Sequence, residues 1–229
     1  MSKAYELIVF DWDGTLMNSL DHITYCLRHA FMDMGLEDRP DHELQRVIGL
    51  GLEQAMMELV PDQDEDFYEQ IVQSYRDHWM GSPPGLSQFY EGIPQLLNQL
   101  YARNIPMAVA TGKSRRGLDK QLQEENVGHF FSCTRCADES VSKPAPDMLL
   151  EILHELSVTP SSTLVIGDTE FDMQMARAAG CDRIAVGYGV HTADSLTPYE
   201  PVTIANTPKE LTQWFEINLF NPNLTLATD

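Results

Sequence analysis

The chain has 229 residues, of which 35 are Asp or Glu and 15 are Lys or Arg, so its formal net charge is −20. A chain this acidic lacks the broad basic surface that binds nucleic acids and anionic membranes, so neither is an expected partner. With 43% hydrophobic residues it can build a substantial core, and its length fits one large domain or one domain with a smaller insertion. The charge also raises a question, because such a protein should repel the many small metabolites that are anions.

The N-terminal segment shows none of the features of a secretory signal. It begins MSKAYELIVFDWDG, with one lysine and a short apolar run that acids interrupt at once, whereas a signal needs a longer apolar stretch and a small-residue cleavage site. No segment approaches the ~20 apolar residues of a membrane span. We therefore expect a cytoplasmic protein, and we take a monomer as the default state.

Four cysteines are spread along the chain: Cys26, Cys133, Cys136 and Cys181. They do not suggest a disulfide scaffold at this length. Cys133 and Cys136 have C-x-x-C spacing, which also occurs in redox and zinc sites, but the second ligand pair of a zinc site is absent from the sequence. We interpret the cysteines as core residues and keep a redox role as the alternative.

The first predicted strand spans residues 5–10, a β-branched and aromatic run that ends abruptly at Asp-Trp-Asp-Gly. From about residue 18 to residue 80, apolar residues recur every three to four positions between glycines and prolines, which predicts about four helices and no strand. The segment 81–85, Gly-Ser-Pro-Pro-Gly, then ends this helical block and is typical of a hinge or linker.

Predicted helices and strands alternate through the rest of the chain. Helices are predicted at about residues 93–103, 114–125, 146–156, 171–179 and 208–215. Strands are predicted at residues 106–110, 130–133, 163–166, 183–186 and 202–205. This alternation predicts an α/β fold with a doubly wound parallel sheet, into which the helical block is inserted after the first strand. The polar tail from residue 218 onward is expected to be loose.

Carboxylates and a hydroxyl follow three of the predicted strands, and ligands of an open α/β sheet bind beyond the carboxyl ends of its strands. A lysine also lies in the loop before the 146–156 helix. The residues at these positions are Asp11, Asp13, Thr111, Gly112, Lys143, Asp168 and Asp172. Each alone has an ordinary explanation, such as a turn or a helix cap. Their shared position at strand ends indicates instead that they form one site.

The chemistry of these side chains points to a metal-assisted reaction on a phosphate group. Clustered carboxylates cannot all stay ionised without a cation, and an all-oxygen site without His or Cys suits Mg²⁺. The ion would make the site attractive to an anion. Backbone amides after Thr111 and the ammonium of Lys143 would bind phosphate oxygens. The sequence therefore predicts phosphoryl transfer on a small phosphorylated metabolite, with Mg²⁺ as the cofactor.

The motifs resemble those of the haloacid dehalogenase superfamily, and specifically those of its phosphatases. Asp11-Trp-Asp13-Gly-Thr-Leu16 is similar to the first family motif, Thr111 to the second, Lys143 to the third, and Gly167-Asp168-x-x-x-Asp172 to the fourth. Within the helical block, Ile48-Gly-Leu-Gly51 resembles the phosphoglycolate-phosphatase-like branch. The resemblance implies a Rossmann-like core of residues 1–16 and 89–217, a helical cap of residues 17–88, and a flexible tail of residues 218–229.

The resemblance also implies a role for each motif residue. Asp11 would attack phosphorus and form an aspartyl-phosphate, while Asp13 would protonate the leaving alcohol and then activate the hydrolytic water. Thr111, Gly112 and Lys143 would bind the phosphoryl oxygens. Mg²⁺ would be held by Asp11, the backbone carbonyl of Asp13, Asp168 and Asp172, the last either directly or through a water.

Two alternatives to a phosphatase remain open at this point. A phosphosugar mutase also keeps both Asp11 and Asp13, whereas a non-catalytic phosphate-binding regulatory protein would be expected to have lost Asp11, Asp13 or Lys143. Arg46 in the cap, and Arg115 and Arg116 after the phosphate-binding turn, are candidate specificity residues, although each has a surface charge as its simpler interpretation. The sequence does not choose among phosphoglycolate, phosphosugars, nucleoside monophosphates and pyrophosphate as the substrate.

Overall fold

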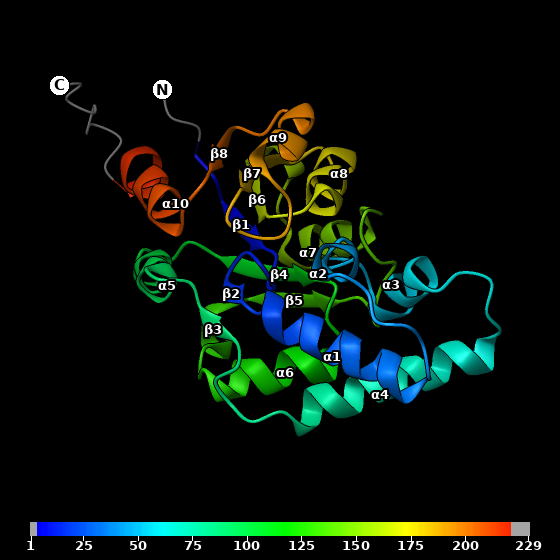
Figure 1. The fold of residues 1–229 in the computed structure, drawn as a ribbon. Helices are drawn as coiled ribbons and strands as arrows, with labels where there is room; N and C mark the ends of the chain where they lie inside the picture. Colours follow the sequence, from blue (N-terminus) through cyan, green and yellow to red (C-terminus); the bar gives the residue numbers. More distant parts are fainter. Residues whose placement is uncertain (1–3, 221–229) are drawn as a thin grey trace.

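The computed structural model of the protein describes residues 4–220. Its centre is a parallel sheet with the strand order β5-β4-β1-β6-β7-β8 (Figure 1). Numbered along the chain, the six strands lie in the order 3-2-1-4-5-6, which is that of a doubly wound α/β sheet. The strands are β1 (Leu7–Phe10), β4 (Met107–Thr111), β5 (Cys133–Cys136), β6 (Thr163–Gly167), β7 (Asp182–Val186) and β8 (Thr203–Ala205). The predicted Rossmann-like fold class is confirmed.

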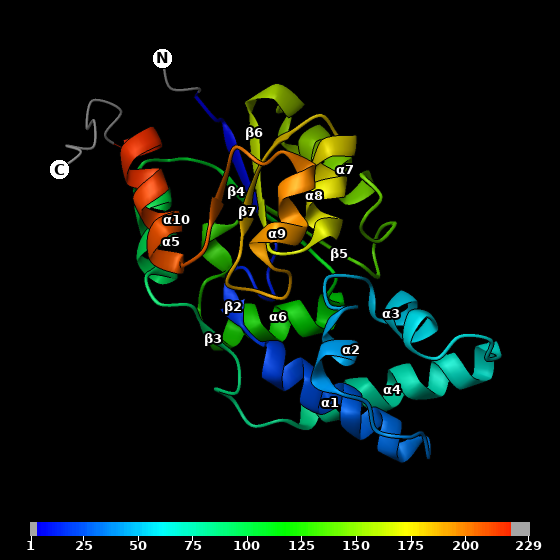
Figure 2. The same cartoon turned by 45° about the horizontal axis from the view of Figure 1, so that its top comes forward.

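Helices cover both faces of this sheet (Figure 2). Side chains alternate along β1, so that Ile8 and Phe10 pack with one set of helices while Leu7 and Val9 pack with the other. The first set is α5 (Ile93–Ala102), α6 (Arg115–Glu124) and α10 (Pro208–Phe215), and the second is α7 (Asp147–Leu156) and α8 (Glu170–Ala178). Burial on both faces explains why β1 is apolar at every position.

The helical block forms a separate layer beyond the carboxyl ends of the central strands (Figure 1). It comprises α1 (Leu20–Asp33), α2 (Asp41–Gln45), α3 (Leu52–Leu59) and α4 (Glu65–Gly81). The apolar side chains predicted at helical spacing, such as Leu27, Met56 and Ile71, form a hydrophobic cluster of their own. This layer therefore has its own small core and lies over the edge of the sheet where the predicted site residues emerge.

A two-stranded sheet joins the helical layer to the rest of the chain. Strand β2 (Met17–Asn18) pairs antiparallel with β3 (Gln88–Phe89), so the chain enters and leaves the helical layer at the same place. The expected cap limits, residues 17 and 88, fall on these two strands. Neither strand was predicted, because two residues are too few to give a recognisable alternation of polar and apolar positions.

The other strands and helices lie close to their predicted positions, with one strand displaced. Strand β5 was expected at residues 130–133 but spans Cys133–Cys136, because Phe130 ends a short 3₁₀ turn and anchors that turn in the core. The short helix α9 (Ala193–Leu196) was not predicted. The tail was expected to be loose from residue 218 onward. Residues 218–220 instead belong to a helical segment, Glu216–Phe220, and residues 221–229 lie outside the described residues. Within residues 4–220, no helix combines the length and the apolar character needed to cross a bilayer.

Candidate active site

The order of the strands brings the predicted site residues together. Phe10, the last residue of β1, pairs with Val109 of β4 on one side and with Ile166 of β6 on the other. The residues that come next along each strand therefore emerge side by side at the point where the strand order reverses. Asp11 and Asp168 meet there, as expected for the ligand-binding crevice of a doubly wound sheet.

Asp11, Asp168 and Asp172 form a buried carboxylate cluster. One oxygen from each lies within 4.8 Å of the others, and all three residues are at most 2% exposed. The ammonium of Lys143, which is also fully buried, donates to Asp11 Oδ1 at 2.7 Å and to Asp172 Oδ1 at 2.6 Å. Asp11 Oδ2 is buried and has no hydrogen-bond partner in the described part of the chain.

The charges of this cluster do not balance. Three carboxylates and one ammonium leave a formal charge of −2 in a region with almost no access to solvent. Burial accordingly raises the pKa of Asp11 well above its usual range, and burial together with Asp172 raises the pKa of Asp168 to about 7. Burial alone would favour the neutral amine of Lys143, but Asp11 and Asp172 outweigh it and raise the pKa of Lys143. An all-oxygen cluster of this charge, with a buried oxygen left unpaired, fits a hard divalent cation.

Two further contacts fix the carboxylate of Asp168. Thr15 Oγ1 donates to its Oδ1 at 2.9 Å, and the Val190 amide donates to its Oδ2 at 2.8 Å. Gly14, which has a φ of +80°, and Gly189 both approach Asp168 so closely that a Cβ at either position would overlap its carboxylate. The loops after β1 and β7 therefore close around Asp168.

Asp172 belongs to the first turn of α8. Its carboxylate accepts hydrogen bonds from the amide and the hydroxyl of Thr169, and Thr169 Oγ1 in turn accepts from the Asp172 amide, which completes a capping box. The same carboxylate accepts from Lys143. Asp172 thus joins the start of α8 to the lysine, in addition to contributing charge to the cluster.

Asp13 lies next to the carboxylate cluster but has different partners. Its Oδ1 accepts a hydrogen bond from Ser19 Oγ at 2.5 Å, and Lys113 Nζ donates to both of its oxygens at 2.9 Å. The side chains of Lys113 and Asp13 are only 7% and 9% exposed. Lys113 was not among the predicted site residues, although it directly follows Thr111 and Gly112 in the sequence.

Thr111 and Gly112 form the turn between β4 and α6. Thr111 is the buried last residue of β4, and its Oγ1 accepts from the Lys113 amide at 3.2 Å. At Gly112, a Cβ would overlap the carbonyl oxygens of Leu50 and Gly49, which belong to the loop before α3. The helical layer therefore contacts this turn through backbone atoms, with no space for a side chain between them.

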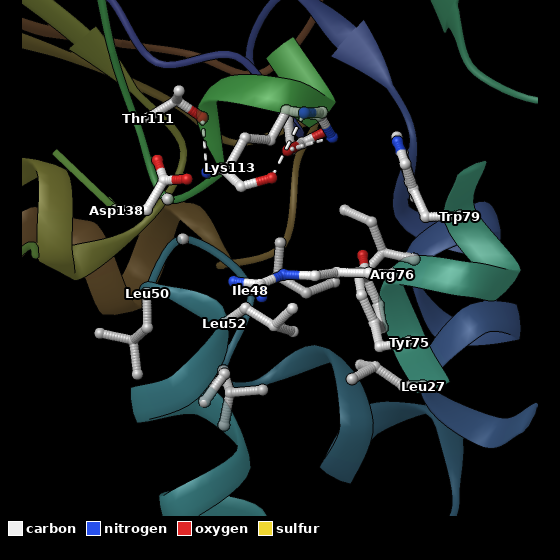
Figure 3. Close-up of a pocket in the computed structure, with 18 of the residues that line it drawn as sticks. Leu27, Ile48, Leu50, Leu52, Tyr75, Arg76, Trp79, Thr111, Lys113 and Asp138 are labelled. Atoms are coloured by element: carbon white, nitrogen blue, oxygen red, sulfur yellow. Dashed lines mark hydrogen bonds and ion pairs between the residues drawn. The ribbon is translucent and has the colours of Figure 1, made fainter. Parts of the chain in front are cut away.

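A cavity of about 310 Å³ opens from these carboxylates into the helical layer (Figure 3). At one end it is lined by Asp11, Asp13 and the Thr111-Gly112-Lys113 turn. The walls of the other end come from α1, α3, α4 and the loop before α3. Four of the predicted site residues, Asp11, Asp13, Thr111 and Gly112, thus line the floor of one pocket. The other three, Lys143, Asp168 and Asp172, lie against Asp11 and outside the lining.

Two of the candidate specificity arginines do not line this cavity. Arg46 is exposed and its Nη2 donates to the carbonyl of Glu58 at 3.3 Å. Arg115 pairs with Glu139 at 2.7 Å and with Asp119 at 3.1 Å. The third candidate, Arg116, does line the cavity, together with Arg76, which was not predicted.

The C-x-x-C pair also lies outside the cavity lining, at the two ends of β5. Both thiols are buried and free. Burial raises the pKa of Cys133 to about 11 and that of Cys136 to about 12. Thiols of this kind carry almost no thiolate near pH 7, which is the form that redox chemistry needs. Their environment agrees with their interpretation as core residues.

Known proteins share both the sequence pattern and the fold. The model of the family described as haloacid dehalogenase-like hydrolase matches residues 8–186. A Dickeya dadantii protein named "Probable phosphatase IndB" is 30% identical over 211 residues, which cover 90% of this chain and 91% of that protein. A phosphoglycolate phosphatase from Aquifex aeolicus is 28% identical over 193 residues, which cover 84% of this chain and 89% of that enzyme.

The solved structure of a haloacid dehalogenase-like family protein from Streptococcus pneumoniae superposes with a TM-score of 0.80 and 26% identity. That superposition covers 92% of this chain and 98% of the other. Together with the family match across most of the chain, it confirms the resemblance and the expectation of an enzyme. The chain belongs to the haloacid dehalogenase-like hydrolase family.

Proposed function

We propose that the protein is a Mg²⁺-dependent phosphatase that hydrolyses a small phosphorylated metabolite through an aspartyl-phosphate on Asp11. The observation that carries this proposal is the pairing at Asp11. Lys143 holds Oδ1, while Oδ2 is buried and has no hydrogen-bond partner among residues 4–220, and Asp11 itself lines the floor of the cavity. One oxygen is thereby fixed and the other is left available as a nucleophile.

The reaction divides into two displacements at phosphorus. In the first, Asp11 Oδ2 forms a bond to phosphorus as the bond to the ester oxygen breaks, and Asp13 acts as the general acid that gives a proton to the departing alcohol. In the second, Asp13 takes a proton from water as the water oxygen attacks the aspartyl-phosphate, which releases inorganic phosphate and restores Asp11. Ser19 and Lys113, which both contact the Asp13 carboxylate, hold that group in place.

The remaining residues bind charge. Thr111 and the backbone amide of Gly112 donate to phosphoryl oxygens, and Lys143 balances the negative charge that accumulates on the transferred group. Asp11, Asp168 and the backbone carbonyl of Asp13 would hold the metal, and Asp172 would add a third carboxylate to the cluster. Mg²⁺, when bound, offsets the excess carboxylates and attracts the phosphoryl group.

Residues 17–88 act in this proposal as a cap on a core of residues 1–16 and 89–217. The cavity supports this role, because its floor comes from the core and its walls from α1, α3 and α4. A layer of helices that closes over the site excludes water and supplies substrate contacts. Phosphoglycolate is the first ester to test, because it is the substrate that the name of the Aquifex relative gives.

The test is the release of inorganic phosphate from a panel of phosphate esters, with Mg²⁺ and with EDTA. We expect release that requires Mg²⁺ and falls at least about a thousandfold in Asp11→Asn, since the nucleophile is lost. Asp119→Asn is the matched control, because it changes an exposed carboxylate on α6 that lies outside the cavity. Activity that survives EDTA or the Asp11→Asn change contradicts the mechanism.

A further inference from the structure

The cavity above the carboxylates is larger and more apolar than a very small leaving group needs. Its volume of about 310 Å³ is that of about ten water molecules in the liquid, at ~30 Å³ each. Leu27, Ile48, Leu52, Tyr75 and Trp79 line it (Figure 3). A two-carbon group such as glycolate would leave most of this apolar surface in contact with water. A phosphosugar would place hydroxyl groups against Leu27, Ile48 and Leu52, whose side chains cannot hydrogen-bond them.

Two arginines from different helices line the same cavity, Arg76 from α4 and Arg116 from α6. Figure 3 shows the Arg76 side chain extending from α4 into the cavity. Neither guanidinium forms an ion pair or a hydrogen bond with any residue between positions 4 and 220. By contrast, Arg28, Arg115 and Arg135 each pair with two carboxylates.

The absence of a carboxylate partner is not unusual by itself, since Arg46, Arg103 and Arg177 also form no ion pair among residues 4–220. What distinguishes Arg76 and Arg116 is that both line the same cavity, with side chains that are exposed. Two unpaired arginines that face one apolar cavity are therefore suited to an anionic group of a bound molecule. The transferred phosphate does not need them, because Lys143, Thr111 and Gly112 already lie at the floor of the site.

We propose that the natural substrate is a phosphate ester whose leaving group has an apolar, ring-sized body and a second anionic group. The phosphate lies over Asp11, the apolar body packs against Leu52 and Tyr75, and the second anion pairs with Arg76 and Arg116. This inference rests on the proposed function and specifies the class of ester. It disfavours phosphoglycolate, which has the anion without the body, and pyrophosphate, which has no apolar part.

Three esters of primary alcohols separate the two features. The compound 4-(phosphonooxymethyl)benzoate has both the ring and the carboxylate, benzyl phosphate has only the ring, and phosphoglycolate has only the carboxylate. Because all three release a primary alcohol, differences in kcat/KM report mainly on binding of the leaving group. We expect the first ester to exceed each of the others by about tenfold or more, which corresponds to about 1.4 kcal/mol in the transition state.

Variants test the residues that we assign to this pocket. The Arg76→Gln/Arg116→Gln double variant should reduce the preference for the carboxylate-bearing ring ester over benzyl phosphate to less than about twofold. Arg46→Gln, at the exposed arginine outside the cavity, should leave that preference unchanged. Leu52→Gln should lower kcat/KM for both ring esters more than for phosphoglycolate, because only the ring esters contact this wall. Thermal unfolding of each variant checks that it is folded.

The outcomes separate the two proposals. If phosphoglycolate has the highest kcat/KM, or if the double arginine variant keeps the full preference, the inference is overturned while Mg²⁺-dependent hydrolysis still stands. If no ester of any class releases phosphate in the presence of Mg²⁺, the proposed function itself fails, and the inference about its substrate fails with it.

Discussion

Replacing Lys143 with methionine tests whether the buried ion pairs organise the carboxylate cluster. Lys143 is fully buried and lies within 2.7 Å of two carboxylates. Methionine keeps most of the apolar volume but removes the charge, which changes the formal charge of the cluster from −2 to −3. Removing one partner of a buried ion pair typically costs about 3–5 kcal/mol, because the other partner stays buried and unpaired.

For a chain of this size, a loss of about 3–5 kcal/mol lowers the melting temperature by roughly 6–20 °C, at about 2–4 °C per kcal/mol. Mg²⁺ should raise the melting temperature of Lys143→Met more than that of the unmodified protein, because the cation then offsets a larger charge. The rate of phosphate release should fall about 100- to 1,000-fold, the usual effect of losing one donor to a transition state.

Thermal unfolding in EDTA, with and without added Mg²⁺, measures the effect on stability. Lys209→Met makes the same chemical change at an exposed lysine on α10, and it should leave the melting temperature within about 1 °C. Adding Asp172→Asn to Lys143→Met should recover part of the lost stability, because it removes one of the unpaired charges. If Lys143→Met unfolds at the same temperature as Lys209→Met, the buried pairs do not hold the site together as we argue.

The remaining predictions concern the helical layer and its contacts. Gly112→Ala places a Cβ against two backbone carbonyl oxygens of the loop before α3, so kcat/KM for phosphate release should fall at least about tenfold. Gly128→Ala is the control, because a Cβ there has its nearest neighbouring atom 4.0 Å away, and it should leave kcat/KM unchanged. Burial, aided by Lys113, lowers the pKa of His22 to about 4 in the folded protein. As the pH falls, the unfolded chain therefore protonates this histidine before the folded protein does, so the free energy of unfolding should decrease between about pH 6.5 and pH 4. His22→Phe should flatten that part of the melting-temperature profile, and an unchanged slope would assign the effect to other groups.

The sequence was sufficient to predict the sheet and the carboxylate cluster, because both depend on local patterns. Asp11 and Asp168 each follow an apolar run that is long enough only for a buried strand. In a parallel sheet, residues at the carboxyl ends of neighbouring strands must lie close together. No knowledge of side-chain packing was needed to bring them to one site.

Which arginines line the cavity could not be decided in the same way, because this depends on how the helices are rotated. Arg115 and Arg116 are adjacent in sequence but point about 100° apart around α6, as residues of an α-helix do. Which of them faces the cavity is decided by the packing of Leu118 and Gly117 against the rest of the protein, and that packing is not a local property. The same holds for Arg46 and Arg76, since the helical layer has to be assembled before either can be placed.

The net charge of −20 is compatible with an anionic substrate, because most of the acids lie away from the cavity. At physiological ionic strength, charges are screened over about 8 Å, so acids on the outer surface have little influence inside the cavity. In the proposed complex the substrate would lie near Lys113, Arg76 and Arg116, which line the cavity, and near Lys143, which contacts Asp11, with Mg²⁺ offsetting the buried carboxylates. The two arginines differ from the lysines in having no carboxylate partner among residues 4–220, and their full charge is available to a ligand. The proposed doubly anionic ester would thus be selected by a few cations that are left unpaired in the cavity of an otherwise acidic protein.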